Sequence, residues 1–410
     1  EMCIRDRKRT PETNIFDMIR EKDLLIHLPY ESFDESVVNF LYSAANDKDV
    51  LAIKQTLYRV SSSSPVVQAL EKAVQNGKQV TVLMEVKARF DEANNILMAR
   101  RLEKAGAHVI YGLVGLKTHS KCTLVIRREK DGIRRYVHVA TGNYNASTAK
   151  LYTDLGILTC NDRFGIDASA FFNLLSGYSD PPIWDSFIVA PINLRQRCIE
   201  LIDREIHFAK NGEDAHMIAK MNSLLDKGII EKLYEASQAG VKIELIVRGI
   251  CVLIPGIPGV SDNITVRSIV GRFLEHSRIF WFRNGGREEL YISSADWMPR
   301  NLNDRVELMV PIEDPEIKRR LKQMVDIELS DNQKAHIMQA DGTWLKTISA
   351  ENQLCAQEYF QKIAEKRDAE DEMTLAQKLE PYTPVLGHGD GSDLSLIHIS
   401  EPTRPRLISY

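Results

Sequence analysis

A pattern of predicted strands and helices that occurs twice along the chain is the feature that most constrains the fold. In the first copy, segments rich in Val, Ile, Leu and Tyr predict strands at residues 51–60, 79–86, 108–114, 122–127 and 136–141. Helices are predicted between them at 65–76 and 91–105, each followed by a glycine suited to a left-handed cap. In the second copy, a predicted helix at 222–238 precedes strands at 242–249, 264–270, 278–282, 290–293 and 305–311. This alternation predicts an α/β sheet covered on both faces.

The two copies also match in detail. Residues 77–83 (GKQVTVL) parallel residues 240–246 (GVKIELI). His119 follows Val109 by the same ten residues that separate His276 from Val266. Two copies of a long unit indicate a duplication rather than a solenoid, which needs three or more short repeats. The expected fold class is therefore α/β, with two α/β/α sandwich domains related by a pseudo-twofold axis.

The domain boundaries follow from this duplication. Residues 23–185 and 186–348 are expected to form the two domains, because a proline-containing link lies between the copies. Residues 1–22 form an N-terminal segment, and residues 349–392 form a charged stretch with a helix expected at 350–366. The ends, 1–7 and 393–410, show no sustained period and resemble translated sequencing-adaptor read-through, so we expect them to be non-native. Finding their codons in the source genome would contradict this expectation.

Composition excludes several classes of protein. The net charge of −4 gives no global basic field, so no nucleic-acid partner is expected, and an anionic substrate would need a local cluster of Arg and Lys. The chain has no apolar run long enough for a membrane span and no charged-then-apolar leader. Its six cysteines lie far apart without zinc-site spacing, which indicates free thiols and favours a reducing cytoplasm.

The element carrying the chemistry is a His-x-basic motif in each copy. The motifs are His119-Ser120-Lys121 and His276-Ser277-Arg278, each predicted at the start of a strand. Alternation along a strand places positions i and i+2 on one face, so each histidine and its cation should point into the same space. Pseudo-twofold packing would then bring two imidazoles and two cations into one cleft. This arrangement suits phosphoryl chemistry, with one imidazole as nucleophile, the other as acid or base, and the cations neutralising phosphate oxygens.

A single His-x-Lys motif is weak evidence, but longer strings make a resemblance specific. The first motif and Gly142-Asn143-Tyr144-Asn145 resemble the HxK and GSxN elements of the phospholipase D superfamily. Between about residues 11 and 348, eight strings resemble polyphosphate kinases of the first, histidine-phosphorylating type: IHLPYESFD, IKQTLYRV, VLMEVKARFDEANN, GLKTHSK, HVATGNYN, LYTDLG, FLEHSRI and SSADWMPRNL. The acidic residue expected five positions after the motif lysine of a phospholipase D is replaced by Ile126 and Arg283.

This resemblance implies two phospholipase D-like domains and a particular reaction. The reaction is reversible transfer of the γ-phosphoryl group between ATP and inorganic polyphosphate through a phosphohistidine. The resemblance implies that His119 is the nucleophile and that His276 is the acid/base partner beside the nucleotide phosphates. A histidine needs little adjustment of its pKa for acid/base work near neutral pH.

Further site residues come from the same resemblance. It implies that Arg59 and Arg89 lie at a magnesium–phosphate site, and that Tyr152 and Arg248 contact the nucleotide. A guanidinium has no lone pair for a metal, so we expect the two arginines to bind phosphate oxygens while phosphate and water hold Mg²⁺.

Three more candidates come from position within the motifs, and other functions stay open. Lys121, Arg278 and Asn143 are expected in the site. One alternative is a phospholipase D-type phosphodiesterase or nuclease using the same two histidines. The other is a non-catalytic polyphosphate-binding module, because family members carry N-terminal domains that this chain begins too late to include. The resemblance also implies a homo-oligomer for the full-length form and allows peripheral membrane association.

Overall fold

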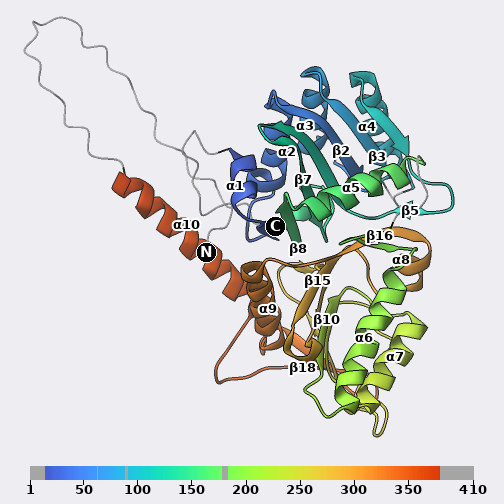
Figure 1. Ribbon diagram of the computed structural model, residues 1–410. Helices are drawn as coiled ribbons and strands as arrows, with labels where there is room; N and C mark the ends of the chain where they lie inside the picture. Colours follow the sequence, from blue (N-terminus) through green and yellow to red (C-terminus); the bar gives the residue numbers. More distant parts are fainter. Residues whose placement is uncertain (1–13, 62, 88–90, 178–182, 379–410) are drawn as a thin grey trace, which may run out of the picture.

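The computed structural model describes residues 14–61, 63–87, 91–177 and 183–378, which fold around two mixed sheets (Figure 1). The first sheet has the order β1 (Leu24–Leu28), β8 (Tyr152–Thr159), β7 (Gly132–Ala140), β6 (Cys122–Glu129), β2 (Val50–Leu57), β3 (Gln79–Met84) and β4 (His108–Tyr111). The second has the order β18 (Trp344–Lys346), β17 (Ala335–Met338), β12 (Ile264–Ile269), β11 (Lys242–Val247), β10 (His216–Met221), β14 (Ile279–Phe282), β15 (Glu289–Ser293) and β16 (Arg305–Pro311). A short strand, β9 (Ile188–Ala190), pairs with β16.

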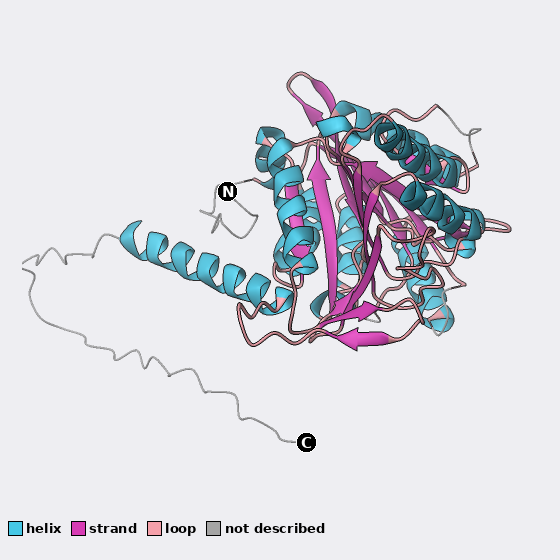
Figure 2. Ribbon diagram, turned by 90° about the horizontal axis from the view of Figure 1, so that it is seen from below, coloured by secondary structure: helices cyan, strands magenta, loops and turns pink. Residues whose placement is uncertain are grey.

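Helices cover both sheets and form three hydrophobic cores. The outer face of the first sheet packs on α1 (Ile15–Glu21), α2 (Asn39–Asn46), α3 (Pro65–Gln75) and α4 (Glu92–Ala105). The outer face of the second sheet packs on α6 (Leu194–Lys210) and α7 (Lys227–Gln238). A core shared by the two halves contains α5 (Asp162–Leu175) and α9 (Pro315–Leu329). Two further helices are α8 (Pro299–Asn303) and α10 (Ala356–Lys378), whose C-terminal end projects away from both sheets (Figures 1 and 2).

The expected duplication is confirmed in the structure. In both halves three neighbouring strands are parallel, β2-β3-β4 and β10-β11-β12, and the next strand is antiparallel. The matched glycines, Gly77 and Gly240, have positive φ of 76° and 99° and follow equivalent helices, α3 and α7. Both helices begin at a side-chain cap, Ser64 or Asp226, that accepts a backbone N–H of the first turn. All ten predicted strands are present, so the α/β fold class is correct.

Some predicted extents are wrong. The helix predicted from residue 222 begins at Lys227, because the N–H groups of Leu225 and Asp226 donate to the Trp297 carbonyl instead. The helix predicted at 350–366 begins at Ala356 and continues to Lys378. The proposed non-native ends, 1–7 and 393–410, lie outside the described residues.

Two short strands cross between the halves and fix their relative position. β5 (Lys117–Thr118) belongs to the first half by sequence but pairs in parallel with β16 of the second. β13 (Leu274–Glu275) belongs to the second half and pairs in parallel with β8 of the first. Each half therefore contributes a short strand to the other half's sheet, and the motif histidines follow these strands directly.

The link between the halves is tied to the first half by one carboxylate. Asp167 on α5 is buried and accepts the N–H groups of Asp185, Ser186 and Phe187 at 3.0, 2.6 and 2.8 Å. The boundary proposed from the sequence, between residues 185 and 186, lies in this link.

The five cysteines among the described residues are free thiols: Cys122, Cys160, Cys198, Cys251 and Cys355. Every helix that the structure describes is too short or too polar to span a bilayer.

Replacing Asp167 should destabilise the fold. Asp167→Ala leaves three backbone N–H groups without their acceptor, and we expect the free energy of unfolding to fall by about 3 kcal/mol. Urea unfolding followed by circular dichroism measures this change. Ile166→Ala, an exposed change on the same helix, is the control and should shift stability by less than about 0.5 kcal/mol. Equal effects of the two changes would contradict the assigned role of the carboxylate.

Candidate active site at the junction of the two halves

A cavity of about 590 Å³ lies between the halves and is lined by both. Seven of the nine candidate residues from the sequence line it: Arg59, His119, Asn143, Tyr152, Arg248, His276 and Arg278. Lys121 is buried beside the cavity and does not line it. Arg89 lies outside the described residues. Both motif histidines therefore face one space, as the pseudo-twofold arrangement predicts.

The local structure of the motifs differs from the expectation. His119 and His276 do not start a strand: each lies in a short irregular segment, between β5 and β6 and between β13 and β14. In this segment the side chain of Lys121 turns back and donates to the carbonyl oxygen of His119. The alternation argument therefore fails for Lys121, because the backbone there is not extended strand.

His119 is oriented by a carboxylate of the other half. Its Nδ1 lies 2.9 Å from both carboxylate oxygens of Glu307 on β16. Ser294 and Asn301 also donate to Glu307, each at 2.5 Å, so three donors converge on this acceptor. If Nδ1 carries the proton, Nε2 presents its lone pair, and Nε2 makes no hydrogen bond to any described residue. The backbone N–H of His119 donates to the Val306 carbonyl at 3.0 Å, which fixes the motif to β16.

His276 repeats the arrangement with the halves exchanged. Its Nδ1 lies 2.8 and 3.0 Å from the two carboxylate oxygens of Asp154 on β8. Its backbone N–H donates to the Thr153 carbonyl at 3.2 Å. Thr141 donates to Asp154 at 2.6 Å, just as Ser294 donates to Glu307. Each imidazole is thus held by a carboxylate from the opposite half, and a hydroxyl group donates a hydrogen bond to each carboxylate.

A glycine next to Thr141 allows this close packing. A Cβ at Gly142 would collide with the side chain of Asp154. Any other residue there would displace the carboxylate that orients His276. The glycine of the GNYN string is therefore explained by the approach of Asp154 to the backbone.

Burial and neighbouring cations lower the pKa of both histidines. The pKa of His119 falls well below its usual value because of burial first, and then because of Lys121 and Arg305. The pKa of His276 is also lowered, by burial and by Arg278, while Asp154 acts in the opposite direction. The expectation that His276 needs little pKa adjustment is therefore wrong, because burial and Arg278 lower this pKa. Both imidazoles are neutral at pH 7, which leaves a lone pair for nucleophilic attack.

The two motif cations have different environments. Arg278 forms an ion pair with Asp296, with Nε 3.1 Å from Oδ1, and its Nη1 lies 2.7 Å from the His276 carbonyl oxygen. No carboxylate pairs directly with Lys121 among the described residues, and burial lowers its pKa to about 7. Lys121 is therefore buried behind the cavity wall and contacts His119 rather than the cavity itself.

Aromatic and polar side chains complete the walls. The ring of Tyr58 packs edge-on against His119 at 4.8 Å, and that of Tyr152 lies 5.1 Å from His276. Arg248 donates to Asn222 at 3.0 Å. Arg59 Nε lies 3.1 Å from Asp91, which holds its guanidinium at the cavity wall. The amide oxygen of Asn143 is buried with no hydrogen-bond partner among the described residues.

The lining is strongly cationic although the whole chain is acidic. Its six cations are Arg59, Lys117, Arg248, Arg278, Arg300 and Arg305. Its two acids are Asp296 and Asp304, and Asp296 already pairs with Arg278. An excess of positive charge in a walled cavity favours a polyanion. The described residues contain no cluster of three or more His, Cys, Asp or Glu side chains able to hold a metal by themselves.

Buried groups behind the second histidine fix its strand. Gln357 of α10 donates to Glu275 at 2.6 Å and exchanges two hydrogen bonds with the backbone of Phe273, at 2.9 and 3.0 Å. The other carboxylate oxygen of Glu275 accepts from Lys220 at 2.6 Å and from Thr153 at 2.8 Å. The first turn of α10 is therefore part of the support of β13.

Several residues of the site were missed in the sequence, among them the two orienting carboxylates and two of the lining cations. Glu307 and Asp154 were not identified, although LYTDLG contains Asp154. Lys117 and Arg305, which pair across β5 and β16, were missed as well. One sequence pattern could have revealed the two carboxylates. β8 begins Tyr152-Thr153-Asp154 and β16 begins Arg305-Val306-Glu307, so each strand has an acidic residue at its third position.

Two family models match the chain. A model described as polyphosphate kinase C-terminal domain 1 matches residues 14–181, and one described as polyphosphate kinase C-terminal domain 2 matches residues 187–357. A polyphosphate kinase of Halalkalibacterium halodurans is 60% identical over 324 residues, which are 79% of this chain and 46% of the relative. The chain spans about half the length of the curated relatives it matches.

Solved structures agree with these matches. The crystal structure of a polyphosphate kinase from Porphyromonas gingivalis is 39% identical with a TM-score of 0.82, and the match covers 88% of this chain and 56% of that one. A phosphatidylserine synthase from Haemophilus influenzae has a TM-score of 0.50 at 12% identity, over 85% of this chain and 94% of that one. The second likeness shows the fold alone, and both agree with the α/β fold class expected from the sequence.

Removing the carboxylate beside His276 should lower the pKa of this histidine further. Asp154→Asn removes a negative charge that favours the imidazolium, so protonation should require a lower pH than in the unchanged protein. NMR titration of ¹³C-labelled histidine side chains measures the change. Asp131→Asn, on an exposed hairpin, is the control and should leave the His276 titration unchanged. An unchanged or raised pKa in Asp154→Asn would contradict the pairing.

Proposed function

The chain belongs to the polyphosphate kinase family, and from this premise we propose that it carries the phosphoryl-transfer site of an ATP:polyphosphate phosphotransferase. The proposed reaction is reversible transfer of the γ-phosphoryl group of ATP to inorganic polyphosphate through a phosphohistidine. One observation carries the proposal: two neutral imidazoles from separate halves, each oriented by a carboxylate of the other half, face one cation-lined cavity.

His119 is the proposed nucleophile. Its Nδ1–H donates to Glu307, so the Nε2 lone pair attacks the γ-phosphorus. A P–N bond forms as the P–O bond to ADP breaks, and the electron pair leaves with ADP. Glu307 stabilises the positive charge that develops on the imidazole. Attack by a terminal oxygen of polyphosphate on the phosphohistidine then lengthens the chain and restores the lone pair.

His276 is the proposed proton carrier. Its pKa is lowered by burial and by Arg278. Bound phosphates add negative charge next to the ring, and negative charge favours the imidazolium. Substrate binding therefore raises the pKa of His276 towards the range useful for acid/base catalysis. Asp154 holds the ring in position while the proton moves at Nε2.

The remaining candidates bind the substrate. Arg59, Arg248 and Arg278 line the cavity and neutralise phosphate oxygens. Tyr152 contacts the nucleotide beside His276, and the unpartnered amide of Asn143 bonds a phosphate or ribose oxygen. Arg89 keeps its proposed place at the magnesium–phosphate site. Lys121 serves as a positioning residue for His119 rather than as a phosphate ligand.

Magnesium is proposed to arrive with the nucleotide. The lining offers six cations and two acids, one of them already paired, so it does not form a carboxylate cage. The phosphate oxygens of the substrate, together with water, would bind Mg²⁺ and balance its charge. The protein's part is to bind the phosphates through its arginines.

The setting of the longer protein is also a proposal. Free cysteines agree with a reducing cytoplasm. A homo-oligomer and peripheral membrane association are implied only by the resemblance.

Labelling with γ-³²P-ATP and magnesium tests the nucleophile. We expect protein-bound label that is labile in acid and stable in base, and its loss in His119→Gln. His276→Ala should slow turnover by about 100-fold or more, because it removes acid/base catalysis. His108→Ala, an exposed histidine of the same half, is the matched control.

Two results would contradict this assignment. Label that persists in a folded His119→Gln protein would exclude His119 as the nucleophile. Hydrolysis of a chromogenic phosphodiester without ATP, combined with no labelling, would favour a phosphodiesterase.

Polyphosphate binding should weaken as salt rises. The ligand is a dense anion and the cavity wall is cationic, so raising NaCl from 50 to 300 mM should reduce affinity on the order of tenfold or more. Filter binding at several salt concentrations gives the slope. Arg248→Ala should make the slope shallower, whereas Arg134→Ala, on an exposed hairpin, should not. Affinity independent of salt would argue against binding in this cavity.

A further inference from the structure

The two motif histidines differ in what surrounds their backbone. Each follows a two-residue strand that pairs in parallel with a strand of the other half, β13 with β8 and β5 with β16. In the first pair Glu275 lies opposite Thr153, and in the second Thr118 lies opposite Val306. Thr153 and Val306 each directly precede the carboxylate that orients the histidine. The same place in the duplicated unit therefore carries a hydroxyl beside one histidine and an apolar side chain beside the other.

The hydroxyl of Thr153 makes two hydrogen bonds in this place. Its oxygen accepts the backbone N–H of His276 at 3.2 Å, and the same N–H lies 3.2 Å from the Thr153 carbonyl oxygen. The hydroxyl donates its own proton to a carboxylate oxygen of Glu275 at 2.8 Å. Thr153 is buried, so water does not compete for these partners. The residue therefore joins the backbone of the histidine to a buried carboxylate.

Glu275 is itself held by side chains of β10 and α10. Lys220 of β10 donates at 2.6 Å to the oxygen that accepts from Thr153, and it also donates to Glu328 near the end of α9. Gln357 of α10 donates to the other oxygen of Glu275 at 2.6 Å. All of these side chains are buried. The hydroxyl of Thr153 is therefore bonded to a carboxylate whose own position is fixed.

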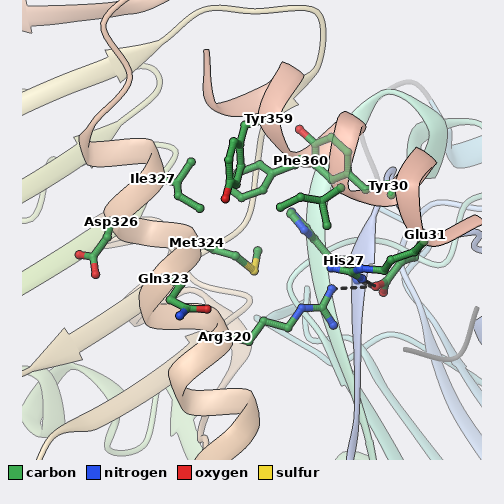
Figure 3. A pocket seen from close by; sticks show the side chains of 13 residues that line it. His27, Tyr30, Glu31, Arg320, Gln323, Met324, Asp326, Ile327, Tyr359 and Phe360 are labelled. Carbon is green, nitrogen blue, oxygen red and sulfur yellow. Dashed lines mark hydrogen bonds and ion pairs between the residues drawn. The ribbon is translucent and has the colours of Figure 1, made fainter. Parts of the chain in front are cut away.

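The segment before Glu275 is held from the side of α10 as well. There α9 and α10 face the turn after β1 across a second cavity of about 450 Å³, which Tyr30 and Phe360 line (Figure 3). The ring of Tyr30 packs edge-on against that of Phe273 at 5.6 Å. Gln357 exchanges two hydrogen bonds with the backbone of Phe273. The whole of β13 therefore has fixed neighbours on the side away from the active site.

No such chain of buried polar groups supports His119 among the described residues. Val306 has only its backbone carbonyl to offer, which accepts the N–H groups of His119 and Ser120 at 3.0 and 2.9 Å. The hydroxyl of Thr118 is buried, and it has no hydrogen-bond partner in the part of the chain that the structure describes. The parallel pairing thus forms both with and without the polar chain. Since buried charged groups are costly, the chain points to a task specific to His276.

The carboxylates that orient the two histidines differ in support too. Besides its histidine, Glu307 accepts from two side chains, whereas within the described residues Asp154 accepts from one, Thr141. Thr153 directly precedes Asp154 in β8. The hydroxyl that bonds the backbone of His276 therefore belongs to the neighbour of the carboxylate that bonds its ring.

We propose that Thr153 is a positioning residue for His276, with Glu275 and Lys220 as its anchor. This role rests on the proposed function of His276 as proton carrier. A proton carrier changes charge in every turnover, and its ring must keep its place relative to Asp154 in both states. The polar chain ties the backbone of the histidine to fixed groups of β10 and α10. Thr153 does not line the active-site cavity, so it acts only through the histidine.

Replacing Thr153 by valine keeps the shape of the side chain and removes the hydroxyl. In NMR titration of the ¹³C-labelled protein, we expect the pKa of His276 to fall, because Asp154 raises this pKa and a looser ring pairs less well with it. Turnover should fall about fivefold, the equivalent of one hydrogen bond, with the KM for ATP changed by less than about twofold. Thr153→Ser, which retains the hydroxyl, should behave like the unchanged protein.

Thr159→Val is the matched control on the same strand. The hydroxyl of Thr159 is also buried, and it accepts the backbone N–H of Asn161 at 3.0 Å, away from both histidines. Its loss should lower stability but leave the titration of His276 and the turnover unchanged. Circular dichroism confirms that each variant is folded.

Three results would overturn the role of Thr153. One is an unchanged titration of His276 in Thr153→Val, and another is an equal change in Thr153→Ser or Thr159→Val. The third is full turnover of Thr153→Val in a protein whose His276 titration has shifted. The titration needs no substrate, so it tests the positioning of His276 even if no phosphoryl group is transferred, and the two proposals fail separately.

Discussion

The site depends on one interaction made twice, an imidazole of one half held by a carboxylate of the other. His119 with Glu307 and His276 with Asp154 fix the orientation of both rings and the distance between the halves at the same time. Such pairs need a rigid support, because buried charged groups are costly when their geometry is poor. The exchanged strands β5 and β13 give that support, since each ends directly before a histidine.

Much of the fold could be predicted because local sequence and burial agree. The strands at 79–84 and 242–247 are rich in β-branched residues, largely buried and each preceded by a glycine with positive φ, so their period and their starts are visible in the sequence. β8 was missed because Thr-Asp-Leu-Gly interrupts its apolar run. Its polar residues are buried by contacts with the other half, and no local pattern records those contacts.

The site was predictable as far as its residues are local in sequence. The two histidines were found because the motif is duplicated, and a resemblance supplied Arg59, Tyr152 and Arg248. The orienting carboxylates lie 188 and 122 residues from their histidines, beyond any spacing argument. Lys121 was predicted in the cavity from its spacing to His119, but this prediction is wrong. The backbone there is irregular, and the Lys121 side chain points into the protein interior.

The exchanged strands also bear on how such a chain can be divided. If the polypeptide were cut in the link near residue 186, the N-terminal fragment would contain β5 without its partner β16. The C-terminal fragment would contain β13 without its partner β8. Each fragment would hold a histidine without its carboxylate and a sheet without the short strand that the other half contributes. Both histidine–carboxylate pairs would form again only if the two fragments reassociated. The two halves of the single chain are thus related like the subunits of a covalently joined heterodimer.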